Sequence, residues 1–147
     1  MIAENLFEEV IYPNSKAYVE AHSLYDVTVS KKRPLTSKIF PIAPMQLITT
    51  RNEFTTLTYG EIRYPFTITI DVYAMDKVIK NDLIAKEKIC DEITKHFVDY
   101  FNNNMKVTIT INNDAPNSDN NIYRNQIVVS GVVDTKYGNN NPIVYPS

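Results

Sequence analysis

The sequence predicts an α+β domain in which a mixed or antiparallel twisted sheet is flanked by one long and one short helix. Residues 64–75 alternate apolar and polar side chains with a period of two, which is typical of a strand with one buried face. Residues 81–101 carry apolar side chains every three or four positions, which is typical of an amphipathic helix. The order of short helix, strands, long helix and strands favours helices packed on a sheet.

Length and composition indicate a single domain over residues 1–147. A chain of 147 residues can bury a core without disulfides or metals, and its 44% apolar and 22% charged residues are unlike those of disordered chains. The acidic start MIAENLFEEV is unlike a basic signal peptide, and no apolar run has the roughly 18 to 20 residues of a membrane span. We therefore expect a protein that stays in the cytoplasm where it is made, without a membrane partner.

The N-terminal segment predicts a short helix over residues 3–11. The apolar residues at helical spacing are Leu6, Phe7 and Val10. Pro13 and Asn14 follow directly, and we expect them to close the helix. Residues 15–24 show no clear period.

Residues 25–30 predict a strand, and residues 31–45 predict an exposed arm. In the strand, Tyr25, Val27 and Val29 alternate with polar residues. The prolines of the arm are Pro34, Pro41 and Pro44. Because proline removes a ladder donor and fixes the backbone, we expect no regular structure in the arm.

Residues 46–50 and 54–59 are rich in threonine, tyrosine and branched residues, and they predict a hairpin that is followed by a second turn at Gly60. Residues 64–75 predict the clearest strand, with Pro65 tolerated near its beginning. The face of this strand that we expect to be buried carries Phe66, Ile68, Ile70, Val72 and Ala74.

Residues 81–101 predict the long helix, with Asn81 or Asp82 as its N-cap and the asparagines at 102–104 as its end. The stripe expected to face the sheet carries Ile89, Ile93, Phe97 and either Tyr100 or Phe101. Cys90, the only cysteine, lies within this pattern, so we expect a buried thiol and no disulfide.

Two further strands are predicted over residues 107–111 and 123–133, and the second is expected to be the last of the fold. Val107, Ile109 and Ile111 alternate with threonines in the first strand. The last strand carries the apolar residues Tyr123, Ile127, Val129 and Val133. A long polar loop joins the two strands. A flexible tail containing glycine, asparagine and proline is expected over about 137–147.

No catalytic, cofactor or metal site can be assembled from the sequence, so we expect neither an enzyme nor a bound cofactor. The three glycines cannot form a phosphate-binding loop or a dinucleotide fingerprint, and no nucleophile motif lies beside His22. Six helical positions separate Cys90 from His96, a turn of about 600° that points them apart, so we expect a surface or capping role for His96. The oxygen-rich loop 113–121 lacks the glycine and glutamate of an EF-hand, and turn formation explains it better.

Charge and tyrosine content bear on the class of partner. The net charge is −2, and the only basic cluster is Lys31, Lys32 and Arg33, so we expect no sequence-specific binding to nucleic acid. The tyrosines in or beside strands and loops are Tyr12, Tyr18, Tyr25, Tyr59, Tyr64 and Tyr73. Tyrosine is common both in protein interfaces and in half-buried sheets, so both interpretations stay open.

Three stretches together resemble the tail terminator proteins of long-tailed bacteriophages, small ring-forming subunits that cap the tail tube and meet the head connector. They are YGEIRYPFTITIDVY at residues 59–73, the helix over 81–101, and PNSDNNIYR at residues 116–124, which leads into the final strand. The resemblance covers roughly residues 46–134 and depends on the order of these pieces, because each piece alone is common. The arm at 31–45 departs from the shortest members of the family.

The resemblance implies a structural protein of the virion neck, present in the host cytoplasm during assembly. It implies a twisted sheet with flanking helices, a homohexameric ring, and contacts with the tail tube protein and with a head-tail connector or neck protein. It implies no catalytic residue. DNA passes through the lumen of such a ring, and a slightly acidic chain would not grip its phosphates.

The candidate interface residues are Lys31, Lys32, Arg33, Tyr59, Glu61 and Arg63. Glu61 and Arg63 lie beside the Gly60 turn on one side of a strand, where rim charges would set partner choice, and the basic triplet could dock on an acidic neighbour. Another head-tail joining or tail completion protein would share this size and architecture. A small cytoplasmic ligand-binding domain is the alternative from a different class, and it would need a concave apolar pocket.

Overall fold

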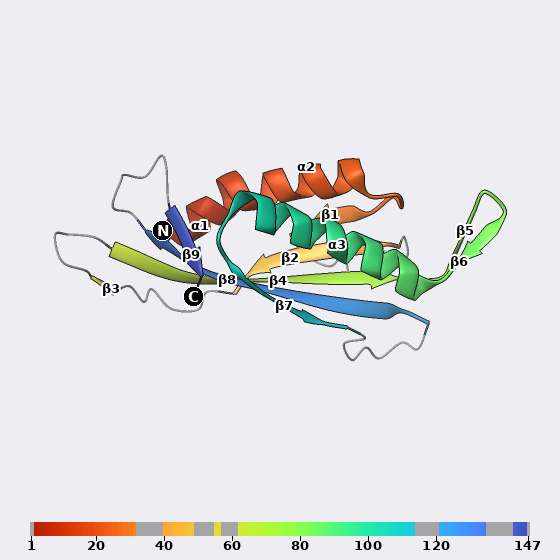
Figure 1. The fold of residues 1–147 in the computed structure, drawn as a ribbon. Helices are drawn as coiled ribbons and strands as arrows, with labels where there is room; N and C mark the ends of the chain where they lie inside the picture. The colour runs from red at the N-terminus through yellow and green to blue at the C-terminus, as the bar shows by residue number, and fades with distance from the viewer. Residues whose placement is uncertain are drawn as a thin grey trace.

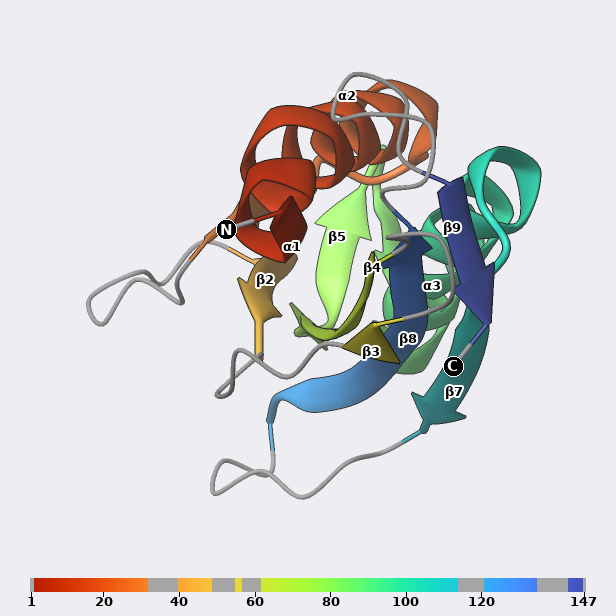
Figure 2. The same ribbon diagram turned by 90° about the vertical axis from the view of Figure 1, so that its left-hand side faces the viewer.

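The structure is a computed structural model, and it describes residues 2–31, 40–48, 55–56, 62–113, 121–134 and 143–146. These residues form an α+β fold in which helices pack on one face of an open mixed sheet, next to a separate two-stranded hairpin (Figure 1). Figure 2 views the same arrangement from one end and shows the sheet curling beneath the helices. At this level the predicted fold class is confirmed.

The sheet has the strand order β1-β2-β4-β8-β7, in which β1 and β2 are parallel and the other neighbours are antiparallel. Its centre is the long pair of β4 (Ile62–Ala74) and β8 (Tyr123–Asp134). The shorter members are β1 (Thr28–Ser30), β2 (Ile42–Leu47), β3 (Thr55–Thr56), β7 (Thr108–Asn112) and β9 (Ile143–Pro146). Strand β3 pairs with β4 and β9 with β8, while β5 (Lys77–Ile79) and β6 (Asp82–Ile84) form the separate hairpin.

Helical structure occupies two stretches on the same face of the sheet (Figures 1 and 2). The N-terminal stretch runs through α1 (Ile2–Leu6), a π-helical segment η1 (Phe7–Ile11) and α2 (Tyr12–His22). The second stretch is α3 (Lys86–Asn104), which has 19 residues.

The core lies between these helices and the sheet, as the periodic patterns predicted. Every residue of the predicted β4 face is buried, from Phe66 at 3% exposed to Ala74 at 0%. The predicted α3 stripe is also buried, and Ile93, Phe97 and Phe101 are 0% exposed. The strand prediction of residues 64–75 and the inward stripe of the long helix are therefore confirmed.

The N-terminal helical stretch is longer than predicted, and the predicted end at Pro13 is wrong. Pro13 lies in the first turn of α2, where proline is tolerated. Directly before it, the Tyr12 N–H donates to the Phe7 carbonyl in the wider π-helical turn. A single stripe of buried residues, spaced four apart, continues on both sides of Pro13: Phe7, Ile11, Ser15 and Val19. Val10, predicted on the inward face, is 37% exposed.

The arm predicted over residues 31–45 is wrong for residues 42–45, which lie in β2 between β1 and β4. The pairing with β4 passes from Ile42 opposite Tyr73 to Met45 opposite Ile70, so it continues on both sides of Pro44. The free energy gained by burying the apolar side chains of this strand outweighs the loss of the one backbone hydrogen bond that Pro44 cannot donate. Residues 32–39 lie outside the described part of the chain.

The pairing of the next segments also differs from the predicted hairpin. Strands β2 and β3 both pair with β4, with Leu47 opposite Ile68 and Thr55 opposite Arg63. The predicted turn at Gly60 lies outside the described residues.

The long helix begins at Lys86 rather than at Asn81 or Asp82, so the predicted N-cap is wrong. Asn81 instead forms the turn of the β5–β6 hairpin, and Asp82 begins β6. The carboxylate of Asp76, which lies before this hairpin in the chain, accepts a 2.8 Å hydrogen bond from the Lys86 N–H and so satisfies one of the four N–H groups that a helix start leaves unpaired.

The C-terminal region contains one more strand than predicted. Residues 143–146 form β9, which pairs with β8 from Gly131 opposite Pro146 to Asp134 opposite Ile143. The predicted tail is therefore wrong for these residues, and β8 is not the last strand. The polar loop 114–120 and residues 135–142 lie outside the described part of the chain.

Candidate interaction surfaces

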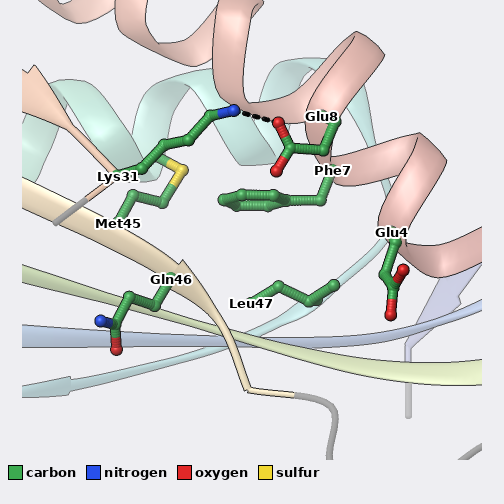
Figure 3. Close-up of a pocket in the computed structure, with 7 residues that line it drawn as sticks. All are labelled: Glu4, Phe7, Glu8, Lys31, Met45, Gln46 and Leu47. Atoms are coloured by element: carbon green, nitrogen blue, oxygen red, sulfur yellow. Dashed lines mark hydrogen bonds and ion pairs between the residues drawn. The ribbon is translucent and has the colours of Figure 1, made fainter.

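A groove of about 550 Å³ opens between the N-terminal helical stretch and the end of β2 (Figure 3). The floor of the groove consists of apolar side chains. Phe7 from η1 and Met45 from β2 form its base and are almost completely buried, at 4% and 0% exposed. The half-buried Leu47 continues this floor toward the end of β2. The charged residues that line the groove are Glu4, Glu8 and Lys31. The site is thus an apolar trough with a charged rim.

The rim of the groove is slightly acidic. The ammonium group of Lys31 forms an ion pair with the Glu8 carboxylate (Figure 3). The same ammonium group lies 5.2 Å from the centre of the Tyr12 ring. The two charged side chains are 49% and 48% exposed, so solvent weakens the pair. Two carboxylates and one ammonium group leave the described rim with a net charge of −1.

The β5–β6 hairpin projects from the end of the molecule opposite to α1 (Figure 1). Val78 lies opposite Leu83, and the two side chains are 65% and 70% exposed. On the other side of the hairpin, Ile79 and Ile84 pack partly against the core. The hairpin is therefore anchored by one face and offers an aliphatic pair to the solvent with the other.

Both residues of the hairpin turn have positive φ angles, which is uncommon for residues other than glycine. Lys80 and Asn81 have φ angles of 52° and 70°, the left-handed region that a two-residue hairpin turn requires. Asparagine adopts this region readily, whereas lysine is disfavoured there. The turn therefore holds a lysine at the tip of a projecting hairpin at some cost in backbone energy.

The two outer edges of the sheet differ. On β1, the Val29 N–H donates to the Glu20 carboxylate at 2.9 Å, and the Val29 carbonyl accepts from the Lys16 ammonium at 2.7 Å. The Thr28 N–H donates to the carbonyl of Pro41, the residue directly before β2. Because the backbone groups of successive residues in a strand point to opposite sides, the N–H and the carbonyl of Val29 point away from β2, and side chains of α2 bind them and close this edge.

Strand β7, at the opposite edge, carries no such protection in the described residues. It pairs with β8 alone, and Thr108, Thr110 and Asn112 are exposed. Ile111 is 41% exposed, and no charged residue interrupts the strand. Natural edge strands are usually blunted by charges, prolines or bulges, so β7 has the properties of a strand that pairs with another chain.

The two histidines, distant in sequence, meet at the joint between α2 and α3. Their ring centroids are 6.3 Å apart, with the Tyr18 ring stacked on His22 at 4.2 Å. His96 Nε2 lies 2.7 Å from a Glu92 carboxylate oxygen, and the same carboxylate accepts from Ser23 Oγ at 3.0 Å. The His96 side chain is 20% exposed, so it packs in the joint rather than standing on the surface. This cluster fastens the end of α2 to α3.

Two buried polar side chains fasten α3 to the sheet. Cys90 Sγ lies 3.3 and 3.4 Å from the carbonyl oxygens of Val72 and Tyr123, which share its single S–H as acceptors, and the thiol is buried as predicted. Asn125, which is 0% exposed, donates to the Asp91 carboxylate at 2.9 Å. Burial raises the pKa of the Cys90 thiol from 9.0 to about 12, so this cysteine stays protonated and inert.

Replacing Cys90 with alanine should lower the free energy of unfolding by on the order of 1 kcal/mol and leave the function of the protein intact. Because the folded pKa of Cys90 is about 12 and its ordinary value is 9.0, the neutral thiol stabilises the fold fully below pH 9. That contribution should fall by up to about 1.4 kcal/mol per pH unit as the pH rises from 9 toward 12. Denaturant melts of both proteins at pH 7 to 11 measure this difference, and parallel pH profiles would contradict it.

The structure places only part of the predicted interface. Lys31 lies on the groove, where it pairs within its own chain. The backbone of Arg63 lies in β4, opposite Thr55 and Asp134. Lys32, Arg33, Tyr59 and Glu61 lie outside the described residues, so their interface role stays a prediction. Among the candidate tyrosines, Tyr25 and Tyr73 are buried, at 8% exposed each, which favours a structural role in the sheet over an interface role for these two.

Sequence reasoning missed the groove and the projecting hairpin. The groove joins residues from α1, η1, β2 and Lys31 just after β1, and no local pattern links these segments. The hairpin did leave a signal, because the residues VIKNDLI place polar turn formers between short apolar pairs.

Comparisons of the chain with protein-family models, with curated proteins and with solved structures found no match. Within the described ranges, no group of three or more His, Cys, Asp or Glu side chains is placed to hold a metal ion. No helix in the described part of the chain is both long and apolar enough to cross a membrane.

Proposed function

We propose that the chain is a tail terminator of a long-tailed bacteriophage, whose copies form a ring of six that caps the tail tube and joins it to the head connector or neck protein. The proposal starts from the resemblance of residues 59–73, 81–101 and 116–124 to that family. The order of β4, α3 and β8 in an α+β fold suits the strand, long helix and strand of these stretches. The work of such a protein is done in the virion neck by binding other chains.

The observation that carries the proposal is the contrast between the two edges of the sheet. Side chains of α2 close the β1 edge, while the β7 edge is exposed and carries no charged residue. A monomer gains nothing from an open, uncharged edge strand and risks aggregation through it. An assembly protein needs such an edge, because main-chain pairing with a second chain joins the two proteins firmly.

In this proposal the β7 edge pairs with the tail tube. A ring built by extending the sheet from copy to copy would need both edges, and Lys16 and Glu20 close one of them. The open edge is therefore left for a different chain. A terminator must bind the end of the tube and block the addition of further subunits, and strand pairing on one side of the subunit achieves both.

The groove favours the second candidate, a small ligand-binding domain. Its volume of about 550 Å³ and apolar floor fall within the range of small-molecule sites. That function would leave the β7 edge and the projecting hairpin without a role. A different neck protein would also use the groove, the β7 edge and the β5–β6 hairpin. Tail length is therefore the property that distinguishes a terminator from such a protein.

Removing the protein from the phage that encodes it tests the function in the cell. A terminator stops tube growth, so its loss should give tails of irregular length that are not attached to heads, while filled heads accumulate normally. Electron micrographs of lysates measure the tail lengths, and a copy supplied in trans serves as the control. Tails of uniform, normal length would show that the protein is not the terminator, and uniform unattached tails would assign it to another neck role.

A further inference from the structure

We propose that the β5–β6 hairpin of one copy inserts Val78 and Leu83 into the groove over Phe7, Met45 and Leu47 of the next copy. This contact gives the ring of the proposed function its subunit interface, and it rests on the self-assembly in that proposal. The partner is a second copy of this chain.

The hairpin has the structure of an inserted element. A two-stranded hairpin is marginal in water on its own, and this one exposes a directly paired valine and leucine at 65% and 70%. Ile79 and Ile84 anchor it to the core, so the exposed pair is held in a fixed place. Covering both side chains would remove apolar surface from water and stabilise the assembly.

The groove complements the hairpin in shape and in charge. Its apolar floor of Phe7, Met45 and Leu47 matches an aliphatic pair, and about 550 Å³ is room for two such side chains. The hairpin carries Lys77, Lys80 and Asp82, a net charge of +1, against −1 for the described rim of the groove. Opposite charges around an apolar contact favour association and set its register.

The positions of the two surfaces determine the kind of assembly. The hairpin and α1, whose residue Glu4 lines the groove, lie at opposite ends of the molecule (Figure 1). A contact between two different surfaces is heterologous, so it can repeat from copy to copy, and it forms a ring when the rotation between neighbouring copies closes. A two-fold dimer would instead place identical surfaces against each other.

Disulfide trapping tests the contact in the full chain. One protein carries Leu83→Cys in the hairpin and another carries Leu47→Cys in the groove, and the native Cys90 stays buried in both. Under mild air oxidation the mixture should give a covalent dimer, while each protein alone should remain a single chain on a non-reducing gel. A chain with both substitutions should give a ladder of covalent oligomers. Leu24→Cys, at a position 80% exposed on neither surface, is the matched control and should not cross-link with Leu47→Cys.

The outcomes separate this inference from the function on which it rests. A covalent dimer formed by the Leu83→Cys protein alone, or the absence of cross-links in a protein that still forms rings, would overturn the hairpin contact and leave the terminator proposal standing. Wild-type protein that forms no rings, alone or on tube ends, would overturn both. A second variant, Leu83→Asp, should shift the protein from oligomer to monomer in sedimentation without changing its circular dichroism, and unchanged sedimentation would count against the contact.

Discussion

Replacing Phe97 with alanine is expected to lower the free energy of unfolding by about 3 to 5 kcal/mol and to prevent soluble accumulation. Phe97 is 0% exposed and is one of the largest fully buried side chains, in the centre of the stripe by which α3 contacts the sheet. Its removal loses the burial of an aromatic ring and leaves a cavity that the rigid β4–β8 pair cannot close. Because small domains are stable by only about 5 to 15 kcal/mol, a loss of this size brings the chain close to unfolding.

Denaturant unfolding of the variant measures this loss, with soluble yield as a second reading. Lys95→Ala, an exposed position on the same helix, is the matched control and should change stability by less than about 0.5 kcal/mol. Equal unfolding midpoints for Phe97→Ala and wild type would show that α3 does not pack through this residue.

Replacing Ile111 with lysine should abolish capping of tail tubes while leaving the fold and the self-association of the chain intact. Ile111 is 41% exposed on the edge strand β7, so lysine can extend into solvent at little cost to the monomer. A charge on an open edge opposes pairing with a second strand, and this is how natural edges are protected. The variant should therefore fold normally and fail at the step that needs the edge.

Co-sedimentation with purified tail tubes measures capping, and circular dichroism checks the fold. Leu24→Lys adds the same charge at a residue that is 80% exposed and lies outside β7, and it should cap tubes normally. Normal tube binding by Ile111→Lys would remove β7 from the contact with the tube. Loss of self-association instead would mean that β7 pairs with another copy.

The strands and helices that the sequence predicted correctly are those with an unbroken period. Phe66 to Ala74 on β4 and Ile89 to Phe101 on α3 repeat their apolar residues regularly, because one face of each element is buried along its whole length. Where proline or asparagine interrupted a pattern, tertiary packing decided the outcome instead. Pro13 is accommodated by a π-helical turn, and Pro44 is kept in β2 by the burial of its neighbours.

The interaction surfaces were harder to predict, because each depends on contacts between distant segments. Only the fold brings Lys31 next to Glu8 and Phe7 next to Met45. Asn81 has the residue type of a helix N-cap, but it lies in the turn of the β5–β6 hairpin, where its positive φ is favourable, and α3 begins five residues later at Lys86. The closed edge of β1 also depends on α2, whereas the predicted N-terminal helix covered only residues 3–11 and did not include Lys16 and Glu20.

Negative-stain electron microscopy of the purified protein, with and without isolated tail tubes, tests the central claim most directly. The account predicts closed rings, free in solution or seated on one end of the tubes, and tubes that no longer elongate once the ring is present. A protein that stays monomeric at high concentration and leaves tube ends bare would contradict it.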